Sequence, residues 1–578
     1  MNKNHPSIEA HRHTLAHVLA MAVLSKYTDA KLGIGPVIEN GFYYDFDIGK
    51  NFKEEELAEF EEMMRDILSH KLNIAGKKVS LAEIKKLFAA QPYKLELAEE
   101  YAREDKELTV YTMGNFTDLC RGGHVDNTSD IDQEAFRLTR IAGAYWQGNE
   151  KNPQLQRIYG VAFNTKKELG EHLAALEEAA RRDHKKLGPE LDLFTFSDLV
   201  GPGLPLWTPK GTLMRNILDD IVWDLRKHYG YQKVEIPHIT KKDLYERSGH
   251  WDKFKDELFR ITTREGREFA LKPMNCPHHT QIYARRQWSY RELPQRYSNT
   301  TMCYRDEQTG ELSGLSRTRS FTQDDAHVFC RKFQFKEEIG SIWNIVTTFY
   351  NKFGFDLSIR LSLSDPAQPE KYLGSRLVWQ EAENALRELI RERGAKSSEA
   401  LGEAAFYGPK IDFLAKDSLG REWQVATIQL DMNMPERFDL YCINEDGERE
   451  RIVMIHAAIL GSLERFLAII IEHYAGAFPF WLAPVQVRIL TINNKVTDYA
   501  QKVITALEQK DIRCERDFRN ESIGKKIREA EMQKVPYILV IGDKEASAGT
   551  INVRTRGKKE TETITLDKFF ESIQTELK

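Results

Sequence analysis

The pattern of hydrophobic and polar residues changes several times along the chain. Near the start, HTLAHVLAMAV has apolar residues at helical spacing, which places His13 and His17 on one face of a helix. Residues 166–187 predict a charged amphipathic helix with a narrow apolar stripe, ended by Gly188 and Pro189. We interpret this second helix as a connector between domains.

Two further patterns follow the connector. Residues 206–237 predict a long helix and then a strand, and FYGPKIDFLAKD and REWQVATIQLDM alternate as strands do. After residue 484, strands such as PVQVRILTINN and VPYILVIGDKE are separated by helical stretches such as TDYAQKVITALEQ. This last pattern predicts an α/β domain with a mostly parallel sheet.

Length and composition set the broad class of protein. A chain of 578 residues with 41% hydrophobic residues should form about three or four globular domains. It has no apolar run long enough to span a bilayer and no signal-peptide pattern at its start, so we expect no membrane association. Six cysteines without close pairing favour a reducing cytoplasm. A net charge of −5 neither requires nor excludes a nucleic-acid partner.

Three residues form a candidate zinc site. Cys276 lies in KPMNCP, His327 follows an acidic pair in FTQDDAH, and His456 lies in MIHAAILGS. One thiolate and two imidazoles would leave a fourth coordination position open, as in catalytic zinc sites. The alternative is a buried thiol and two hydrogen-bonded core histidines, because such distant positions carry little specificity.

Two arginines suggest a nucleotide site. Arg305 and Glu307 form an R-x-E unit that we expect on a strand, with both side chains on one face. Arg465 ends GSLER in an apolar helix that we expect to include His456. Guanidinium groups are permanently charged and bind phosphate in a bidentate manner. Ordinary salt bridges are the alternative for isolated arginines.

The N-terminal region carries a second chemical signature. His13 and His17 are four residues apart, and Cys120 and His124 repeat this spacing in DLCRGGH. The two pairs could hold a metal or line a polar pocket that handles an ester and a water molecule. A packed helix face is the alternative for either pair alone.

Together these strings resemble the class II aminoacyl-tRNA synthetases. CYRDEQTG resembles their motif 2, GSLERF their motif 3, and the helix and strand of residues 206–237 their motif 1, which forms a dimer interface. KPMNCP, FTQDDAH, FYGPKIDF and MIHAAILGS resemble the threonyl-tRNA synthetases in particular. The resemblance implies a class II catalytic domain built on a mainly antiparallel sheet, with an N-terminal α+β editing domain and a C-terminal α/β anticodon-binding domain. The expected boundaries are 1–165 for editing, 166–187 for the connector, 188–483 for catalysis and 484–578 for anticodon binding.

The resemblance also implies an activity and partners. Threonine would be activated with ATP to threonyl-adenylate and transferred to the terminal adenosine of tRNA(Thr), and mischarged seryl-tRNA would be hydrolysed. One Zn²⁺ per subunit, Mg²⁺ with the ATP, and a homodimer formed through the catalytic domain are expected. Serine differs from threonine by one methyl group, which discriminates by only roughly 1–3 kcal/mol, so a hydrolytic correction is physically reasonable.

Residue roles follow from the same resemblance. Those expected in catalysis are Arg305, Glu307, Arg465 and Lys410; in threonine binding, Met274, Asp325, Tyr407 and Gln429; in zinc binding, Cys276, His327 and His456. ATP binding would involve Arg305, Glu307, Arg317, Phe321, Gln424, Thr427 and Arg465. Editing would involve His13, His17, Tyr44, Lys94, Asp118, Cys120 and His124, and anticodon recognition Asn520, Glu545 and Arg554.

The sequence also departs from the family pattern. Gly123 replaces a usual proline, so we expect a less rigid Cys120–His124 loop. His278, Asp306 and Ala457 replace a usual glycine, asparagine and arginine and would tune substrate or inhibitor binding. The chain is expected to start directly at the editing domain, without the ubiquitin-like domain of many bacterial relatives. Two rival hypotheses are another class II enzyme, such as the prolyl enzyme, and a regulatory RNA-binding protein that has lost catalysis.

Overall fold

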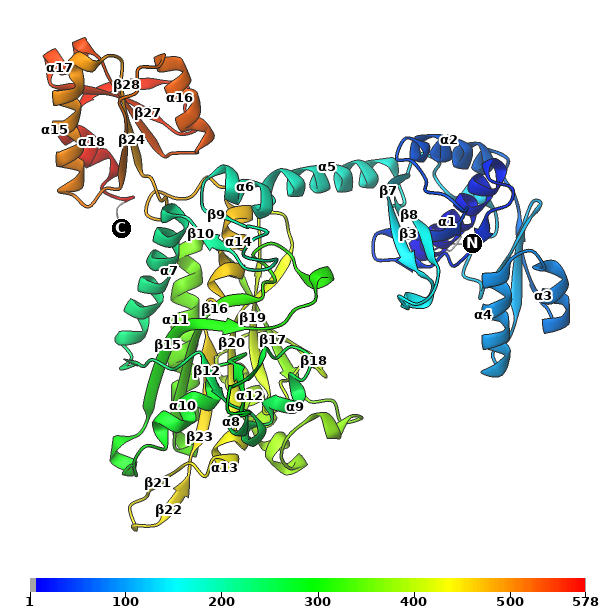
Figure 1. The fold of residues 1–578 in the computed structure, drawn as a ribbon, viewed down its shortest axis with the longest axis horizontal. Coiled ribbons are helices and arrows are strands. Elements are labelled where there is room, and N and C mark those ends of the chain that lie inside the picture. Colours follow the sequence, from blue (N-terminus) through cyan, green and yellow to red (C-terminus); the bar gives the residue numbers. More distant parts are fainter. Residues whose placement is uncertain (1–6, 577–578) are drawn as a thin grey trace. The chain divides into compact units, whose positions relative to one another are not determined.

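The computed structural model describes residues 7–576, which divide between Glu177 and Glu178 into two compact units (Figure 1). None of the helices among the described residues has the length and apolar character needed to cross a membrane. Each unit has its own hydrophobic core, and each contains one of the two candidate chemical centres.

The first unit packs helices against two sheets. Helix α1 (Ile8–Lys26) starts at Ser7, whose side chain accepts a hydrogen bond from the backbone of Ala10, and its apolar residues are buried against the larger sheet. That sheet has the order β1-β3-β8-β7, with β2 paired to β3. Its strands are β1 (Lys31–Leu32), β2 (Val37–Ile38), β3 (Gly41–Asp47), β7 (Phe136–Tyr145) and β8 (Gln154–Ala162). The second sheet and the other helices are β4 (Ile74–Lys78), β5 (Thr109–Met113), β6 (Phe116–Leu119), α2 (Glu56–Ser69), α3 (Leu81–Leu87) and α4 (Pro92–Arg103).

The connector differs from the sequence prediction. Helix α5 (Lys166–Arg182) ends before Asp183, whose side chain accepts from the backbone of Lys185 and caps a second helix, α6 (His184–Glu190). The predicted stop at Gly188 and Pro189 was therefore wrong, because both residues lie inside α6. Of the predicted apolar stripe, only Leu169 is buried.

A mixed but mainly antiparallel sheet of eight strands forms the centre of the second unit, which confirms the predicted fold class. The strand order is β11-β15-β16-β23-β20-β19-β17-β18, and only the outermost pair at each edge is parallel. The strands are β11 (Gln232–Lys233), β15 (Gln295–Tyr304), β16 (Ser320–Cys330), β17 (Leu357–Leu363), β18 (Ser397–Leu401), β19 (Lys410–Lys416), β20 (Glu422–Asp431) and β23 (Val453–Ala458).

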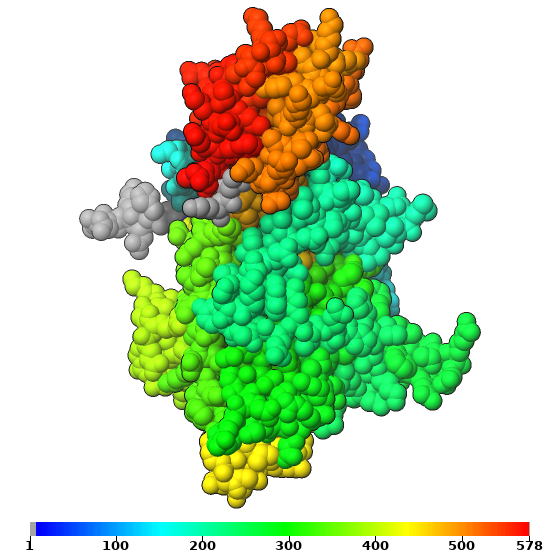
Figure 2. Space-filling view, turned by 90° about the vertical axis from the view of Figure 1, so that its left-hand side faces the viewer, coloured from blue at the N-terminus to red at the C-terminus, as the bar shows by residue number. Residues whose placement is uncertain are grey.

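Helices cover one face of this sheet, and residues on the other face line a cavity. The long helices α7 (Pro209–Lys227), α11 (Phe335–Phe353) and α14 (Leu463–His473) share a large apolar core with the sheet, and α12 (Arg376–Glu392) packs by β17. Shorter elements complete this part of the unit: β9 (Phe194–Thr195), β10 (Leu206–Trp207), β12 (Ile239–Lys241), β13 (Arg260–Thr262), β14 (Glu268–Leu271), α8 (Lys242–Ser248), α9 (His250–Lys253), α10 (Cys276–Tyr283) and α13 (Asn433–Arg437). The hairpin of β21 (Tyr441–Ile443) and β22 (Arg449–Arg451) projects from it, in yellow at the bottom of Figure 2.

The C-terminal region is an α/β domain whose sheet is only partly parallel. The order is β25-β24-β26-β27-β28. Strands β24, β25 and β26 run parallel to one another, β27 is antiparallel to β26, and β28 is antiparallel to β27. The prediction of a mostly parallel sheet was therefore only half right. The elements are β24 (Val487–Thr491), β25 (Cys514–Asp517), β26 (Tyr537–Ile541), β27 (Thr550–Thr555), β28 (Thr561–Thr565), α15 (Thr497–Glu508), α16 (Ile523–Met532), α17 (Asp543–Ala548) and α18 (Leu566–Ile573).

A fully buried ion pair joins α7 to the central sheet. Arg226 on α7 donates to the carboxylate of Asp324 on β16, and also to the hydroxyl of Ser298 on β15 at 3.0 Å. The second Asp324 oxygen accepts from the backbone N–H groups of Ile459 and Leu460 at 2.8 and 3.0 Å. A single carboxylate therefore connects a helix, a strand and the turn that follows β23.

We expect Arg226→Met to lower the free energy of unfolding by about 3–5 kcal/mol, because it leaves Asp324 charged and buried without a counter-ion. Urea denaturation measures this loss. The control is Lys227→Met, which removes an exposed pair with Asp224 and should cost less than about 1 kcal/mol. Equal effects of the two substitutions would show that the buried pair does not hold α7 to the sheet.

Candidate functional site

The open face of the central sheet holds a cavity of about 520 Å³. Its lining includes every residue expected to bind zinc, threonine or ATP: Met274, Cys276, Arg305, Glu307, Arg317, Phe321, Asp325, His327, Tyr407, Gln424, Thr427, Gln429, His456 and Arg465. Segments from Met274 to Arg465 thus meet in one place, because four adjacent strands and their loops supply the side chains. The structure does not bring Lys410 into this lining.

Strand register places the two histidines of the candidate metal site. His327 on β16 lies directly opposite His456 on β23, and Cys276 is the first residue of α10. One ligand atom from each of the three residues lies within 4.8 Å of the others, and all three residues are buried. Nε2 of His327 and Nδ1 of His456 are 3.0 Å apart.

Hydrogen bonds from outside orient these two rings. Nδ1 of His327 bonds to Nδ1 of His279 at 2.8 Å, and Nε2 of His456 bonds to Asp431 Oδ2 at 2.9 Å. The remaining nitrogens, His327 Nε2 and His456 Nδ1, lie next to each other beside Cys276, and outer hydrogen bonds of this kind orient histidine ligands in metal sites. Burial lowers the pKa of His327 well below its ordinary value, so its imidazole is neutral and able to act as a ligand. The donor set, one sulfur and two nitrogens, suits zinc.

The residues expected to bind the amino acid surround this cluster. Asp325 lies on the same face of β16 as His327, its Oδ1 is 3.7 Å from His327 Nε2, and its Oδ2 accepts from Asn275 at 3.1 Å. Burial raises the pKa of Asp325 to about 6. The ring of Tyr407 lies 4.9 Å from that of His456, and Gln429 is opposite His456 on β20. A carboxylate, a phenol and an amide thus converge beside the candidate zinc ligands.

The arginine and carboxylate pair lies in a loop and not on a strand. Strand β15 ends at Tyr304, so the prediction of a strand for Arg305 and Glu307 was wrong. The guanidinium of Arg305 lies 5.2 and 5.3 Å from the ring centres of Phe254 and Phe321. Glu307 accepts from Nε and Nη2 of Arg317 at 2.8 and 2.6 Å. The loop is therefore held by its own charged side chains before any ligand binds.

Arg465 reaches the cavity from the first turn of α14. Ser462 caps this helix, and its hydroxyl accepts from the backbone of Arg465 at 3.1 Å. His456 lies on β23, so the expectation that both residues share one helix was wrong. Within residues 7–576 no carboxylate pairs with the Arg465 guanidinium, which lies 5.8 Å from the ring of Trp423. An unneutralised guanidinium at the cavity edge suits an anionic group.

Lys410 pairs with a buried acid, Asp412, which also binds two residues of the cavity lining. Its Nζ lies 3.0 Å from Asp412 Oδ2, and the other oxygen of Asp412 accepts from Gln424 and Thr427 at 2.8 and 2.9 Å. Asp412 was missed by sequence reasoning, as were His279, Asp431 and His250, whose Nε2 is 3.7 Å from Cys276 Sγ. The signals that could have found them were a histidine near the cysteine, and acids in the predicted strand patterns.

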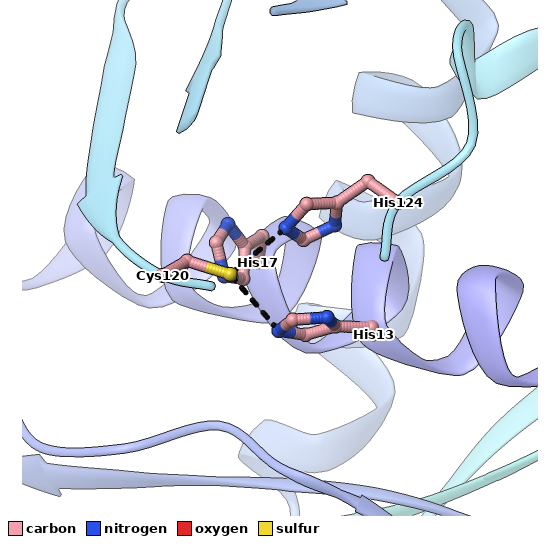
Figure 3. Close-up of side chains that lie close together, drawn as sticks. All are labelled: His13, His17, Cys120 and His124. Atoms are coloured by element: carbon pink, nitrogen blue, oxygen red, sulfur yellow. Dashed lines mark hydrogen bonds between the residues drawn. The ribbon is translucent and has the colours of Figure 1, made fainter. Parts of the chain in front are cut away.

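The first unit gathers the four residues of the N-terminal signature. His13 and His17 come from α1, while Cys120 and His124 lie in the loop after β6, and Figure 3 shows the four side chains pointing toward one another. Cys120 Sγ is 3.3 Å from His13 Nε2 and 3.2 Å from His124 Nε2, and the four residues have ligand atoms close enough to hold a metal ion. Burial lowers the pKa of His124 to about 2 and that of His17 well below its ordinary value, and it raises the pKa of Cys120 to about 11. The cluster is therefore neutral at physiological pH.

Asp118 is the charged centre beside this cluster. Its carboxylate pairs with Lys94 Nζ at 2.6 Å, accepts from the hydroxyl of Tyr44 at 2.5 Å and lies 3.6 Å from His17 Nε2. Both Lys94 and Asp118 are at least 98% buried. The structure thus brings all seven residues of the expected editing set into one centre.

The loop between Cys120 and His124 depends on two glycines. Gly122 and Gly123 have φ values of +94° and +86°, and a proline at 123 could not adopt this conformation because its ring fixes φ near −65°. The Gly122 N–H donates to Cys120 Sγ at 3.3 Å. Residue 123 therefore has a backbone conformation that proline cannot adopt, in a loop that donates a hydrogen bond to the Cys120 thiol.

The three expected anticodon residues are not all brought together. Asn520 follows β25 and Glu545 follows β26. Because both strands run parallel to β24, the two residues lie at the same end of the C-terminal sheet, where these strands finish. Arg554 pairs in register with Ile538, near the other end of β26, and its guanidinium bonds to Glu531 at 3.3 Å. Glu545 accepts from the backbone of Gly542, which caps α17.

Comparison with known proteins agrees with this organisation. Residues 108–159 match the threonyl and alanyl tRNA synthetase second additional domain, residues 259–474 the class II tRNA synthetase core domain (G, H, P, S and T), and residues 486–576 an anticodon-binding domain. A Giardia lamblia prolyl-tRNA synthetase structure with 17% identity and a TM-score of 0.54 covers 69% of this chain and 79% of that one, and shares the fold alone.

Threonine-specific relatives are much more similar. The chain is 47% identical to a Porphyromonas gingivalis threonine–tRNA ligase over 98% of this chain and 87% of that protein. It is 48% identical to one from Gloeobacter violaceus over 98% and 92% of the two chains. A Cryptosporidium parvum threonyl-tRNA synthetase structure, described as its RNA-binding domain, has a TM-score of 0.65 and 38% identity, and covers 68% of this chain and 98% of that one. The chain therefore belongs to the threonine–tRNA ligase family of class II aminoacyl-tRNA synthetases.

Proposed function

We propose that the chain activates threonine with ATP, transfers it to tRNA(Thr) and hydrolyses seryl-tRNA in its first unit. The observation that carries the first step is the Cys276, His327 and His456 cluster, which shares one cavity with Arg305 and Arg465. Family membership supports the same overall reaction.

Zinc fits the cluster because Cys276, His327 and His456 each offer a ligand atom within 4.8 Å of the others. A bound zinc ion would supply a Lewis acid that takes the amino group and hydroxyl of threonine. Asp325 and Tyr407 would hold the amino group, and Met274 and Gln429 would shape the pocket around the side chain. Valine lacks the hydroxyl and would leave a desolvated polar site unmatched, so it would be rejected strongly.

The arginines supply the electrostatics for adenylate formation. The threonine carboxylate attacks the α-phosphorus of ATP, and pyrophosphate leaves with the electron pair of the broken P–O bond. Arg305 would bind the α-phosphate, Arg465 would bind the rest of the triphosphate together with Mg²⁺, and Phe321 would stack on the adenine. A ribose hydroxyl of the tRNA then attacks the threonyl carbonyl, and AMP leaves.

The first unit would remove serine that this cavity does not reject. A water molecule attacks the ester carbonyl of seryl-tRNA, and the neutral imidazole of His13 or His17 would accept its proton. The bond from the carbonyl carbon to the ribose oxygen then breaks, the imidazole returns the proton to that oxygen, and serine and the uncharged tRNA are released. Asp118 would fix His17 and Lys94, and the Lys94 ammonium would stabilise the developing oxyanion. The glycine path at 122–123 passes close to His13, because a Cβ placed on Gly123 would be in van der Waals contact with His13 Nδ1 at 3.9 Å.

The proposal includes a homodimer formed through the catalytic domain, in the cytoplasm. Its support is the large exposed apolar side chains in the segments that precede and follow α7 in the sequence, which include Leu199, Leu206 and Ile239 at 100%, 40% and 50% exposure. Asn520 and Glu545, at one end of the C-terminal sheet, are the candidates for contacts to anticodon bases.

The first test is pyrophosphate exchange into ATP with threonine, serine, valine or proline. We expect exchange that depends strongly on threonine and is lost with a zinc chelator. Cys276→Ser should lower the rate at least about 100-fold and remove zinc from the protein, measured by elemental analysis. Cys514→Ser, a free cysteine in the C-terminal domain, is the control and should change neither. Proline-dependent exchange, or none at all, would refute the proposal.

A second test concerns phosphate recognition. Arg465→Lys keeps the charge but loses the planar donor pair, so kcat/KM for ATP should fall by about 10²–10³-fold at saturating threonine. Zinc content should be unchanged. Arg286→Lys changes an exposed arginine paired with Glu292 and should behave as the wild type. A normal kcat/KM in Arg465→Lys would remove Arg465 from the nucleotide site.

A third test separates editing from activation. His17→Ala should slow hydrolysis of seryl-tRNA by about 10²-fold and leave threonine-dependent exchange intact. His70→Ala, on the surface of the same unit, is the control. Because burial holds the pKa of His17 well below 6.5, its imidazole stays neutral as the pH falls from about 8 to about 6, so the hydrolysis rate should show no His17 titration in this range. A decline centred near 6.5 would contradict the assignment.

A further inference from the structure

A buried histidine at the start of α6 bonds to the loop between β15 and β16. His184 is 3% exposed, and its ring nitrogens bond to two different elements. Nε2 accepts from the backbone N–H of Leu315 at 3.0 Å, and Nδ1 lies 2.6 Å from Glu472 Oε1 on α14. None of the roles described above uses this residue.

The partners fix the tautomer of the ring. A backbone N–H can only donate, so Nε2 carries no proton and Nδ1 donates to the carboxylate. Glu472 also accepts from the backbone of His184 at 3.2 Å, and its other oxygen accepts from Arg421 at 2.5 Å. Burial alone would raise the pKa of Glu472, but the bonds from His184 and Arg421 lower it to about 2, so the acceptor stays charged. The imidazole is thus held rigidly from the helix side.

The loop that His184 contacts carries the nucleotide residues. It spans residues 305–319, and its tip is a turn in which Ser313 N–H donates to Arg317 O at 3.1 Å and Ser316 N–H to Ser313 O at 2.9 Å. Leu315, Ser316 and Thr318 line the cavity with Arg305, Glu307 and Arg317. The tip lies directly on the imidazole, because a Cβ built on Gly314, which has φ +53°, would be 2.3 Å from His184 Nε2.

We propose that His184 is a positioning residue for ATP, which fixes the tip of the 305–319 loop by accepting the Leu315 N–H. The inference rests on the proposed nucleotide role of this loop. His184 is the second residue after α5 ends at Arg182, and Arg182 itself bonds to Ser418 and to the backbone of His473. The residues that directly follow the connector helix α5 therefore hold the 305–319 loop.

A pair of substitutions separates the two hydrogen bonds of the ring. The amide nitrogen of His184→Asn takes the place of Nδ1 and can still donate to Glu472, but nothing reaches Leu315. The longer His184→Gln can place its amide oxygen where Nε2 was and accept from Leu315. We expect His184→Asn to raise KM for ATP about tenfold in threonine-dependent pyrophosphate exchange, as loss of one buried hydrogen bond would. KM for threonine should stay within about twofold, and His184→Gln should lie close to the wild type.

Hydrogen–deuterium exchange of the protein without substrates gives the second readout. Peptides covering 313–317 should exchange about tenfold faster in His184→Asn than in the wild type, with no such change in His184→Gln or in the exposed control Lys186→Gln. If both variants at 184 lower kcat and both KM values together, in step with a lower melting temperature, His184 only supports the core and the inference fails. If His184→Asn leaves ATP KM and loop exchange unchanged, it also fails. A wild type without threonine-dependent pyrophosphate exchange would refute the proposed function. Hydrogen–deuterium exchange of residues 313–317 would still test the contact between His184 and the loop.

Discussion

The catalytic half of the molecule depends on the register of four antiparallel strands. Lys410 lies opposite Gln429, Gln429 opposite His456, and His456 opposite His327, so one row of side chains crosses β19, β20, β23 and β16. Side chains alternate along each strand, and therefore Gln429, His456 and His327 of this row line the cavity while the intervening residues face the helices. Asp324 and Asp325 show the alternation directly, because the first pairs with Arg226 on the helix side and the second lies beside the metal cluster.

Both chemical centres also rely on a buried acid that holds a basic group. Asp431 orients His456 and is itself held by the backbone N–H groups of Asn433 and Met434 at 2.8 and 2.9 Å. In the first unit, Asp118 holds Lys94 and faces His17. A charged acceptor fixed by backbone donors or by a lysine sets the direction of its partner before substrate arrives, which is the condition for efficient electrostatic catalysis.

Local pattern predicted much of the fold and some of the site. The helix with His13 and His17, the strands β19 and β20, and the family itself were evident from periodicity and from specific strings such as KPMNCP. The segment from His456 to Arg465 was misjudged because a short apolar run fits a buried strand as well as a helix. Gly461, with φ +69°, and the cap Ser462 separate strand from helix there. Asp183 breaks the connector through a side-chain cap, which a polar helix pattern conceals. His279, Asp431 and Asp412 carried local signals, a histidine near the cysteine and acids within strand patterns, but their partners are set only when distant strands pair.

The row of side chains across the sheet also decides where the chain can change in length. One residue inserted into β16, β20 or β23 would turn every side chain beyond it to the opposite face, so the polar set would enter the apolar core. The hairpin of β21 and β22 can lengthen or shorten without moving the row, because it projects from the catalytic body (Figure 1). Insertions and deletions among relatives should therefore accumulate in that hairpin and be absent from the four strands.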